Sequence, residues 1–264
     1  MQEIKRVTFV GAGNLSTQLA KVLYSKGISI NQIYSRTEES AQLLAEQVGA
    51  KFTHDLTQLT ADADLYFFSV KDDALEQVLC DFPHRNSKIV HTAGSIPMSI
   101  LKDFSSIYGV FYPLQTFSKL RDVDFHYIPF CIESSEEAFT LQLKNLAGKL
   151  SNDVRDVDSN QRQSVHLAAV FVCNFVNYMY TIGHDLMMDS DLDFNLLRPL
   201  IQETAQKVMH ANPREMQTGP AVRFDEKVMN KHLDFLKNKE ELQELYKFVS
   251  KQIFKNYKLG TTEK

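Results

Sequence analysis

The chain has 264 residues, of which 44% are hydrophobic and 23% charged, enough for a buried core in two domains or one large one. The formal net charge of −4, without a long run of one sign, argues against nucleic acid or an anionic membrane as the main partner. The three cysteines lack the spacing of metal ligands or of a disulfide framework. We therefore expect reduced, mostly buried thiols, no metal site and a cytoplasmic protein.

Residues 1–157 alternate between strand-like and helical segments. Strands are predicted at 6–13, 28–36, 50–55, 62–70, 87–94, 106–114 and 126–134, with an edge strand at 153–158. Helices are predicted at 14–27, 37–49, 71–82 and 135–151. Alternation of this kind predicts an α/β domain with a doubly wound, mostly parallel sheet that is covered on both faces.

The second half, residues 158–264, shows helical periodicity and almost no strand signal. We expect an all-helical second domain of three to five helices. Its most apolar stretch, residues 167–182, is shorter than the roughly 20 residues that cross a bilayer and contains two asparagines. We therefore expect this stretch to be a buried core helix, and we expect the chain to have no membrane partner.

A glycine turn stands at the start of the first domain, between its first strand and first helix. Gly11 and Gly13 fit the first two positions of the G-x-G-x-x-G fingerprint, and Ser16 takes the third. Gly11 would permit the tight turn, and Gly13 would let a diphosphate approach the helix N-terminus, which Asn14 and Leu15 begin. This context predicts a Rossmann-type dinucleotide site; the alternative is a plain strand-to-helix turn.

The end of the second predicted strand indicates which dinucleotide would bind. NAD-selective folds place an acidic residue there, whereas this chain has Ser35, Arg36 and Thr37. The Arg36 guanidinium suits a phosphate dianion, and the two hydroxyls can add hydrogen bonds. We therefore predict NADP over NAD; the alternative is a solvated arginine beside a helix cap.

Three further strands end in polar residues at the carboxyl edge of the predicted sheet, where ligands bind in this architecture. Ser69, Val70 and Lys71 follow the fourth strand, and Lys71 is either a phosphate or substrate ligand or an exposed lysine. His91 and Thr92 end the fifth, and His91 is either an acid/base or a hydrogen-bonded loop residue. The residues expected to shape the wall beside the nicotinamide follow the sixth: Tyr112, Pro113, Gln115 and Thr116.

A polar stripe is predicted along the apolar helix at about 160–188. At ~100° per residue, His166, Asn174, Asn177, Thr181 and His184 fall on one narrow face. Buried polar groups need partners, which a cofactor-and-substrate cleft would supply. The alternative is partners on neighbouring helices or at a dimer interface. His166 and Asn174 are the best candidates for the cleft.

Seven segments together resemble a bacterial group of NADP oxidoreductases, over nearly the whole chain and in order: VGAGNLSTQLA, SRT, FSVKDDAL, HTAGS, FYPLQTFS, VHLAAVFVCNFVNYMY and TGPAVRFD. Members of this group join a Rossmann domain to a helical C-terminal domain. They are related to pyrroline-5-carboxylate reductase and the deazaflavin-dependent NADP reductases. The resemblance implies NADP as cofactor and redox chemistry on a small metabolite.

The layout is also similar, more distantly, to 6-phosphogluconate and β-hydroxyacid dehydrogenases. Those enzymes carry a catalytic Lys four residues before an Asn on the first long helix of the second domain. Asn174 matches that Asn, whereas Val170 takes the place of the Lys and cannot donate or relay a proton. In TGPAVRFD, Phe224 stands where many relatives have Gly.

These observations favour an NADP(H)-dependent oxidoreductase that acts on a small polar metabolite, an imine, ketone or hydroxyacid, in the interdomain cleft. His166 or His91 would be the acid/base, and Asn174 and Thr92 would orient the substrate. Val170 motivates the alternative of a non-catalytic NADP(H)-binding sensor or regulatory protein. A protein that binds another nucleotide or S-adenosylmethionine is a third hypothesis. The apolar helix further suggests a homodimer through the helical domain.

Overall fold

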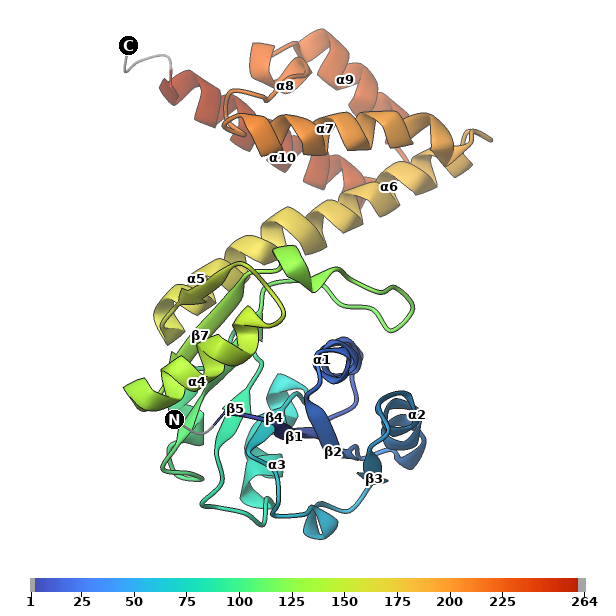
Figure 1. Ribbon diagram of the computed structural model, residues 1–264. Coiled ribbons are helices and arrows are strands. Elements are labelled where there is room, and N and C mark those ends of the chain that lie inside the picture. The colour runs from blue at the N-terminus through green and yellow to red at the C-terminus, as the bar shows by residue number, and fades with distance from the viewer. Residues whose placement is uncertain (1–2, 261–264) are drawn as a thin grey trace. The chain divides into compact units, whose positions relative to one another are not determined.

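The computed structural model describes residues 3–260, and its first half is built on one sheet (Figure 1). The strand order is β3–β2–β1–β4–β5–β6–β7–β8, and every neighbouring pair is parallel except β6 with β7. The strands are β1 (Arg6–Val10), β2 (Ser29–Tyr34), β3 (Lys51–Thr53), β4 (Leu65–Phe68), β5 (Ile89–His91), β6 (Tyr108–Pro113), β7 (Phe130–Ser134) and β8 (Val154–Asp156). The predicted mostly parallel sheet is therefore confirmed.

Helices cover both faces of this sheet because its central strands are apolar on both sides. Along β4, Phe67 packs on the face with α1 (Asn14–Ser25), α2 (Glu38–Val48) and α4 (Glu137–Gly148). Tyr66 and Phe68 pack on the opposite face, with α3 (Leu75–Cys80) and the 3₁₀ turn η3 (Met98–Leu101). The doubly wound arrangement thus follows from the side-chain alternation of each strand.

The second half is helical throughout its described part, as predicted. The helices are α5 (Ser159–Ala169), α6 (Val176–Met188), α7 (Arg198–His210), α8 (Pro220–Arg223), α9 (Glu226–Phe235) and α10 (Glu240–Gly260). A π-helical turn, η5 (Val170–Phe175), joins α5 to α6. Helix α8 ends at Phe224, which has a φ of 53°, a left-handed conformation that glycine adopts more readily.

Two compact units divide the chain between Met179 and Tyr180, not between residues 157 and 158 as the sequence suggests. The difference arises because α5 is tied to the sheet. The Arg162 side chain is fully buried and bonds Glu133 of β7, and His166 contacts Tyr112 of β6. These contacts hold the first turns of the long helix to the α/β unit.

The expectation that the long helix is buried on most of its circumference is wrong for the single chain. Leu167, Phe171, Val172 and Phe175 are 60%, 59%, 74% and 48% exposed. The continuous helix Ser159–Met188 also exceeds the predicted apolar stretch, so by length and composition alone it would suffice to cross a membrane. Cys80 is exposed as well, contrary to the expectation of mostly buried thiols.

Candidate cofactor and active site

The turn between β1 and α1 has the two steric properties that the glycine fingerprint requires. Gly11 has a φ of +120°, and a Cβ there would lie 2.3 Å from the Ser69 carbonyl oxygen, so a side chain has no room. A Cβ on Gly13 would meet nothing within 4 Å, so the space over the helix N-terminus is open. Asn14 opens α1, Leu15 follows, and the first turn contains no acidic residue. This N-terminus can accept a diphosphate.

The residues predicted to select NADP follow β2 directly. Ser35 is half-buried, whereas Arg36 and Thr37 are exposed, and Thr37 is the N-cap residue of α2. Among the described residues, no carboxylate forms an ion pair with Arg36. The guanidinium is therefore available to an anion at the carboxyl edge of the sheet, near the start of α2.

The ends of β4 and β5 meet beside this turn. The Thr92 hydroxyl donates a hydrogen bond of 3.0 Å to the Ser69 hydroxyl, and the Ser69 amide donates to the Val10 carbonyl. Val70 contacts the position that a Gly11 side chain would take. Lys71 is exposed and caps a 3₁₀ turn. The structure therefore brings together the predicted residues of both strand ends, with Lys71 at the rim.

His91 is placed where it cannot act as the predicted acid/base. Its side chain is fully buried, and its Nδ1 accepts a hydrogen bond from the Ala93 amide. Burial, with a further contribution from the Arg162 charge, lowers the pKa of His91 to about 3. The imidazole is therefore neutral near pH 7 and closed off from a substrate, which corrects the expectation.

His166 lies instead at a polar junction of three elements. Its Nδ1 is 3.2 Å from the Tyr112 hydroxyl, and the two rings meet nearly edge to face at 71°. Gly94, in the loop after β5, lies against the same ring: a Cβ there would come within 2.5 Å of Nδ1. His166 is half-buried, so one side of the ring remains accessible.

A buried ion pair anchors the helix that carries His166. Arg162 donates to a Glu133 carboxylate oxygen at 2.5 Å and to the Ile96 carbonyl at 2.6 Å. The Ser159 hydroxyl donates to the same carboxylate at 2.8 Å. Sequence reasoning missed this network. Arg162 stands in the polar run Ser159–Ser164, so nothing in the local sequence distinguishes it from an exposed arginine.

The remaining stripe residues do not follow the predicted face. The angular count assumed an uninterrupted α-helix, but the i→i+5 bonds of η5 add a residue to the turn and rotate everything after it. Val170 and Asn174 lie inside η5, where a spacing of four residues no longer means a shared face. Asn174 is exposed. Thr181 and His184 belong to the second compact unit, whereas His166 belongs to the first.

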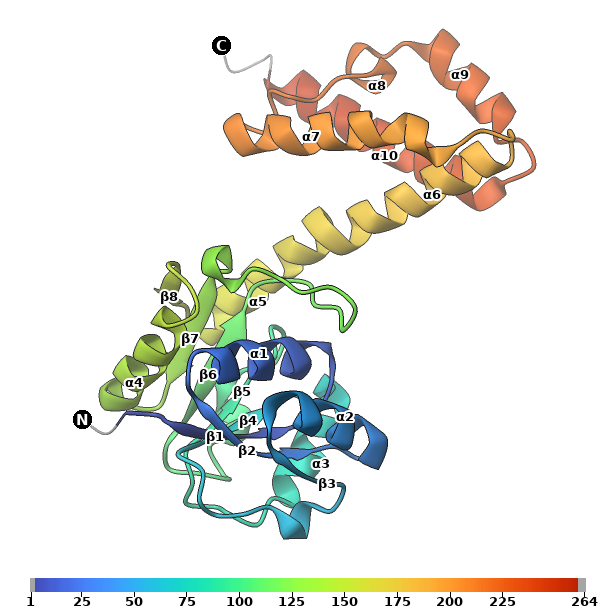
Figure 2. The same ribbon diagram turned by 45° about the vertical axis from the view of Figure 1, so that its right-hand side comes forward.

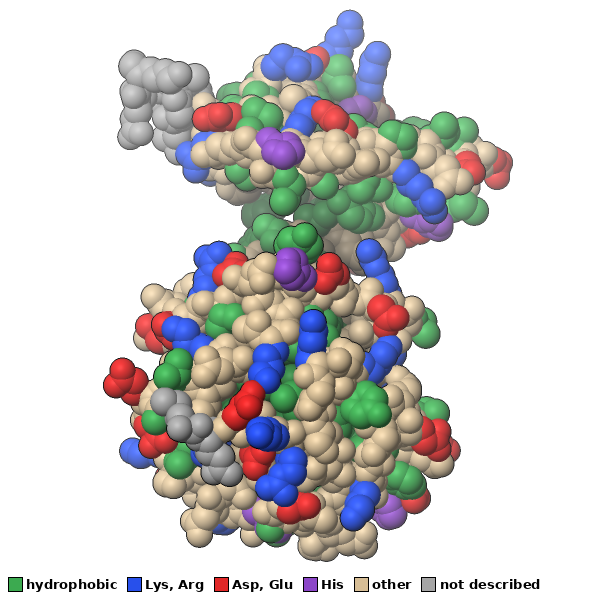
Figure 3. Space-filling model, in the orientation of Figure 1, with side chains coloured by type: hydrophobic (Ala, Val, Ile, Leu, Met, Phe, Trp, Pro, Cys, Tyr) green, Lys and Arg blue, Asp and Glu red, His purple; other side chains and the backbone are tan. Residues whose placement is uncertain are grey.

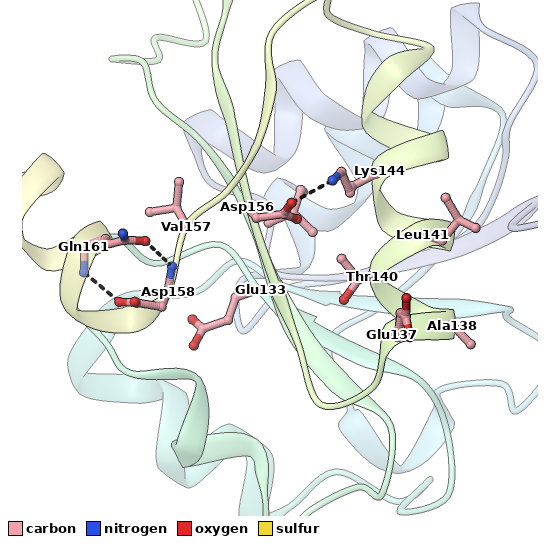
Figure 4. Close-up of a pocket in the computed structure, with 11 residues that line it drawn as sticks. Glu133, Glu137, Ala138, Thr140, Leu141, Lys144, Asp156, Val157, Asp158 and Gln161 are labelled. Atoms are coloured by element: carbon pink, nitrogen blue, oxygen red, sulfur yellow. Dashed lines mark hydrogen bonds and ion pairs between the residues drawn. The ribbon is translucent and has the colours of Figure 1, made fainter.

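A pocket of about 840 Å³ lies apart from all predicted site residues, beside α4, β8 and the start of α5 (Figure 4). Three of its carboxylates serve the fold. Asp156 pairs with Lys144, Asp158 caps α5 in a reciprocal pair with Gln161, and Glu133 holds Arg162. Within residues 3–260, no group of three His, Cys, Asp or Glu side chains could hold a metal ion. The glycine turn and the His166 junction therefore remain the candidate site.

Comparison with known proteins agrees with this geometry. The profile described as "NADP oxidoreductase coenzyme F420-dependent" matches residues 6–92, and a domain of unknown function, DUF2520, matches residues 128–253. No curated protein sequence matches.

Solved structures resemble the chain over nearly its full length. One from Bacteroides fragilis, described as an NADP oxidoreductase, has a TM-score of 0.90 and 47% identity, covering 96% of this chain and 98% of that one. Pyrroline-5-carboxylate reductase from Streptococcus pyogenes (TM-score 0.60, 12% identity, 95% and 98% coverage) shares the fold. So does a reductive aminase from Aspergillus terreus, solved with NADPH and ethyl-5-oxohexanoate (TM-score 0.71, 14% identity, 95% of each chain). At 47% identity over nearly its whole length, the chain belongs to the NADP oxidoreductase family of the Bacteroides fragilis protein.

Proposed function

We propose that this protein is an NADP(H)-dependent oxidoreductase that acts on a C=N or C=O group, or the corresponding hydroxyacid, of a small polar metabolite. The observation that carries the proposal is the open space at Gly13 over the N-terminus of α1, with Arg36, which forms no ion pair within residues 3–260, after the next strand. The family supports the same cofactor, and the fold is shared with reductases of imines and ketones.

The chain's own residues suit each part of this cofactor. The first-turn amides of α1, at Asn14 and Leu15, would hold the diphosphate, since the first four N–H groups of a helix have no partner within it. Arg36, with Ser35 and Thr37, would hold the 2′-phosphate. When bound, the cofactor supplies hydride chemistry, and the protein must position the substrate and exchange a proton.

His166 is the side chain that we assign to the proton exchange, with Thr92 and Asn174 as orienting groups. Its ring is half-buried beside the ends of β5 and β6, so it is both held in place and accessible. Asn174, exposed on η5, is the weaker of the two orienting candidates because it lies two helical turns beyond His166.

Thermal stabilisation by NADPH and NADH, together with turnover, tests the proposal. NADPH at about 100 times its Kd should stabilise the fold by roughly 2.7 kcal/mol. Arg36→Ala should weaken NADPH binding about 10- to 100-fold and leave NADH binding unchanged, because a hydrogen bond to a charged group contributes roughly 1.5–3 kcal/mol. Lys51→Ala is the matched control. Lys51 is an exposed cation at the first residue of β3, so it lies away from the carboxyl edge of the sheet.

Turnover is then measured as NADPH oxidation with 1-pyrroline-5-carboxylate, with cyclohexanone plus allyl amine, and with ethyl 5-oxohexanoate. A panel of hydroxyacids is tested with NADP⁺. Binding of NADPH without turnover of any of these compounds would favour the alternative, a non-catalytic NADP(H) sensor, for which the apolar Val170 at the position of a catalytic lysine is the supporting observation. No stabilisation by NADPH would contradict both.

We also propose a homodimer that forms through the helical unit. Large apolar side chains such as Leu196, Leu200 and Met209 are uncovered on that unit, and the face of the sheet unit that Figure 3 shows is mostly polar. A membrane is the less suitable cover for the long helix Ser159–Met188, because it also carries His166, Asn174 and Asp185, and polar groups are expensive in lipid. The free cysteines fit a cytoplasmic location.

A further inference from the structure

Tyr112 and His166 form a contact that the proposed function does not yet use. Tyr112 is the second-last residue of β6, and its ring is buried, with 8% of its surface exposed. Its hydroxyl lies 3.2 Å from Nδ1 of His166, which α5 brings to the same edge of the sheet. The buried Arg162–Glu133 pair fixes α5 one turn earlier, so the position of the His166 backbone is set independently of this contact.

Gly94 adds evidence that the two rings are placed closely by the fold. A Cβ at this position would lie 2.5 Å from Nδ1 of His166, 2.8 Å from its Cγ and 3.0 Å from Cζ of Tyr112. The φ of Gly94 lies outside the left-handed region, so the backbone does not need glycine there. Glycine is required there by the lack of space, because a side chain at residue 94 would collide with the His166 and Tyr112 rings in these positions.

The Tyr112 hydroxyl is able to donate this hydrogen bond. Burial raises the pKa of Tyr112 to about 12, so the phenol keeps its proton at any physiological pH. Among the described residues, Nδ1 of His166 is its hydrogen-bond partner, and Nδ1 accepts that proton in the tautomer that leaves this nitrogen without a hydrogen. A neutral imidazole carries one proton, which then resides on Nε2, the other ring nitrogen.

We propose that Tyr112 is a positioning residue: its hydroxyl holds His166 in the Nε2–H form and aims that N–H at the substrate atom that takes up a proton. The inference rests on the proposed function. The substrate carbon accepts the hydride from NADPH, which leaves as NADP⁺. The π-electron pair of the C=N or C=O bond moves to nitrogen or oxygen, and that atom bonds the Nε2 proton. Nδ1 then takes the Tyr112 proton. When water reprotonates Nε2, Nδ1 returns that proton to the tyrosinate, which restores the Nε2–H form.

The first test reads the tautomer of His166 directly, without cofactor or turnover. Nuclear magnetic resonance of the full chain with ¹⁵N-labelled histidine rings distinguishes Nδ1–H from Nε2–H, and the His166→Gln variant assigns the signal. Wild type should show Nε2–H with a hydrogen-bonded Nδ1, and Tyr112→Phe should shift the ring toward a mixture. Tyr127→Phe is the matched control, because Tyr127 is exposed and its ring lies against that of His126 instead.

The second test measures the pH dependence of kcat with a panel compound that wild type reduces, beginning with 1-pyrroline-5-carboxylate. Tyr112→Phe should lower kcat about 10-fold or more and displace the pH profile, while the KM for NADPH stays unchanged. Gly94→Ala should change both the tautomer signal and kcat, because its methyl group displaces the His166 ring.

The outcomes separate the two proposals. Nδ1–H in wild type, or an unchanged His166 signal in Tyr112→Phe, overturns the positioning role whether or not the protein turns over any substrate. An unchanged kcat and pH profile in Tyr112→Phe does the same. If wild type reduces nothing on the panel while the tautomer signals respond as expected, the proposed function is in error and the Tyr112–His166 geometry stands.

Discussion

At the scale of single residues, the two glycines of the first turn, Gly11 and Gly13, have different roles. Gly11 is required by the fold, because its φ is +120° and the Ser69 carbonyl occupies the position next to it. Gly13 has an ordinary φ of −78° and open space around it, so the fold alone would accept a side chain there. Its lack of a side chain matters only if something binds over the helix N-terminus.

This contrast gives a matched pair of variants. Gly13→Ala should keep the free energy of unfolding of wild type within about 1 kcal/mol, since Gly-to-Ala effects at compatible positions are of that size. It should nonetheless lose most of the stabilisation by NADPH, because the methyl group fills the space of the diphosphate. Gly11→Ala should lose stability without any ligand. Chemical denaturation with and without NADPH measures both, and equal NADPH stabilisation in Gly13→Ala and wild type would argue against the diphosphate site.

His91 makes a residue-scale prediction about pH. Its pKa is about 3 in the folded chain and near 6.5 when unfolded, so below pH 6.5 the unfolded chain binds a proton that the folded chain does not. Stability therefore falls as the pH falls. Between pH 6 and 4, the free energy of unfolding of wild type should fall more steeply than that of His91→Asn, by up to about 1.4 kcal/mol per pH unit. Identical slopes in the two proteins would contradict a buried neutral His91.

At the scale of elements, two features of the long helix differ from the pattern that the sequence predicts. Its first turns belong to the α/β unit because Arg162 is buried against β7, and its middle is the π-helical turn η5. The first feature places His166 beside Tyr112. The second interrupts the regular α-helical spacing between His166 and Asn174. The anchoring of the first turns and the π-helical turn therefore together determine which side chains of the long helix can reach the candidate site.

The buried Arg162–Glu133 ion pair predicts that loss of the Arg162 charge alone strongly lowers the free energy of unfolding. Arg162→Met leaves the Glu133 carboxylate without its main partner, and breaking a buried ion pair in this way costs about 3–5 kcal/mol. Chemical denaturation of the intact chain measures the change. Arg155→Met is the control, because that arginine forms an exposed pair with Asp153, and it should have little effect. Similar effects of the two substitutions would show that the Arg162 pair contributes no more than a surface contact.

At the scale of the whole molecule, the helical unit leaves several large apolar side chains uncovered, and such surface often marks an interaction site. Leu200 and Val208, eight residues apart on α7, are 63% and 45% exposed, and Leu196, in the 3₁₀ turn Phe194–Leu197 just before α7, is 65% exposed. Figure 2 shows α7 beside α10 in this unit. A second copy of the chain would cover such a face by the same hydrophobic burial that drives folding.

The dimer prediction is tested by mass in solution. Light scattering after gel filtration should give about twice the 30.2 kDa of the single chain. Leu200→Glu should shift the mass toward the monomer, because it places a charge in the apolar face. Gln202→Glu introduces the same group on the polar side of α7 and should leave the mass unchanged. A monomeric wild type at micromolar concentration, or a protein that stays in solution only with detergent, would contradict the homodimer.

The sequence by itself determined the features that depend on neighbouring residues. Apolar alternation and helical spacing were sufficient for the doubly wound sheet and the helical second half, and the glycine turn, with Ser35–Arg36–Thr37 after the next strand, was sufficient to suggest the cofactor. These signals are local, because each is produced within one strand, helix or turn.

Only the tertiary structure decided how the candidate catalytic groups meet. Burial made His91 neutral, the Gly94 backbone left room for the His166 ring, and Tyr112 met that ring from a strand 54 residues away. The π-helical turn interrupted the regular spacing on which the helical count for Asn174 depended. Each of these outcomes depends on contacts between segments that are distant in the chain, and no periodicity within a segment records them.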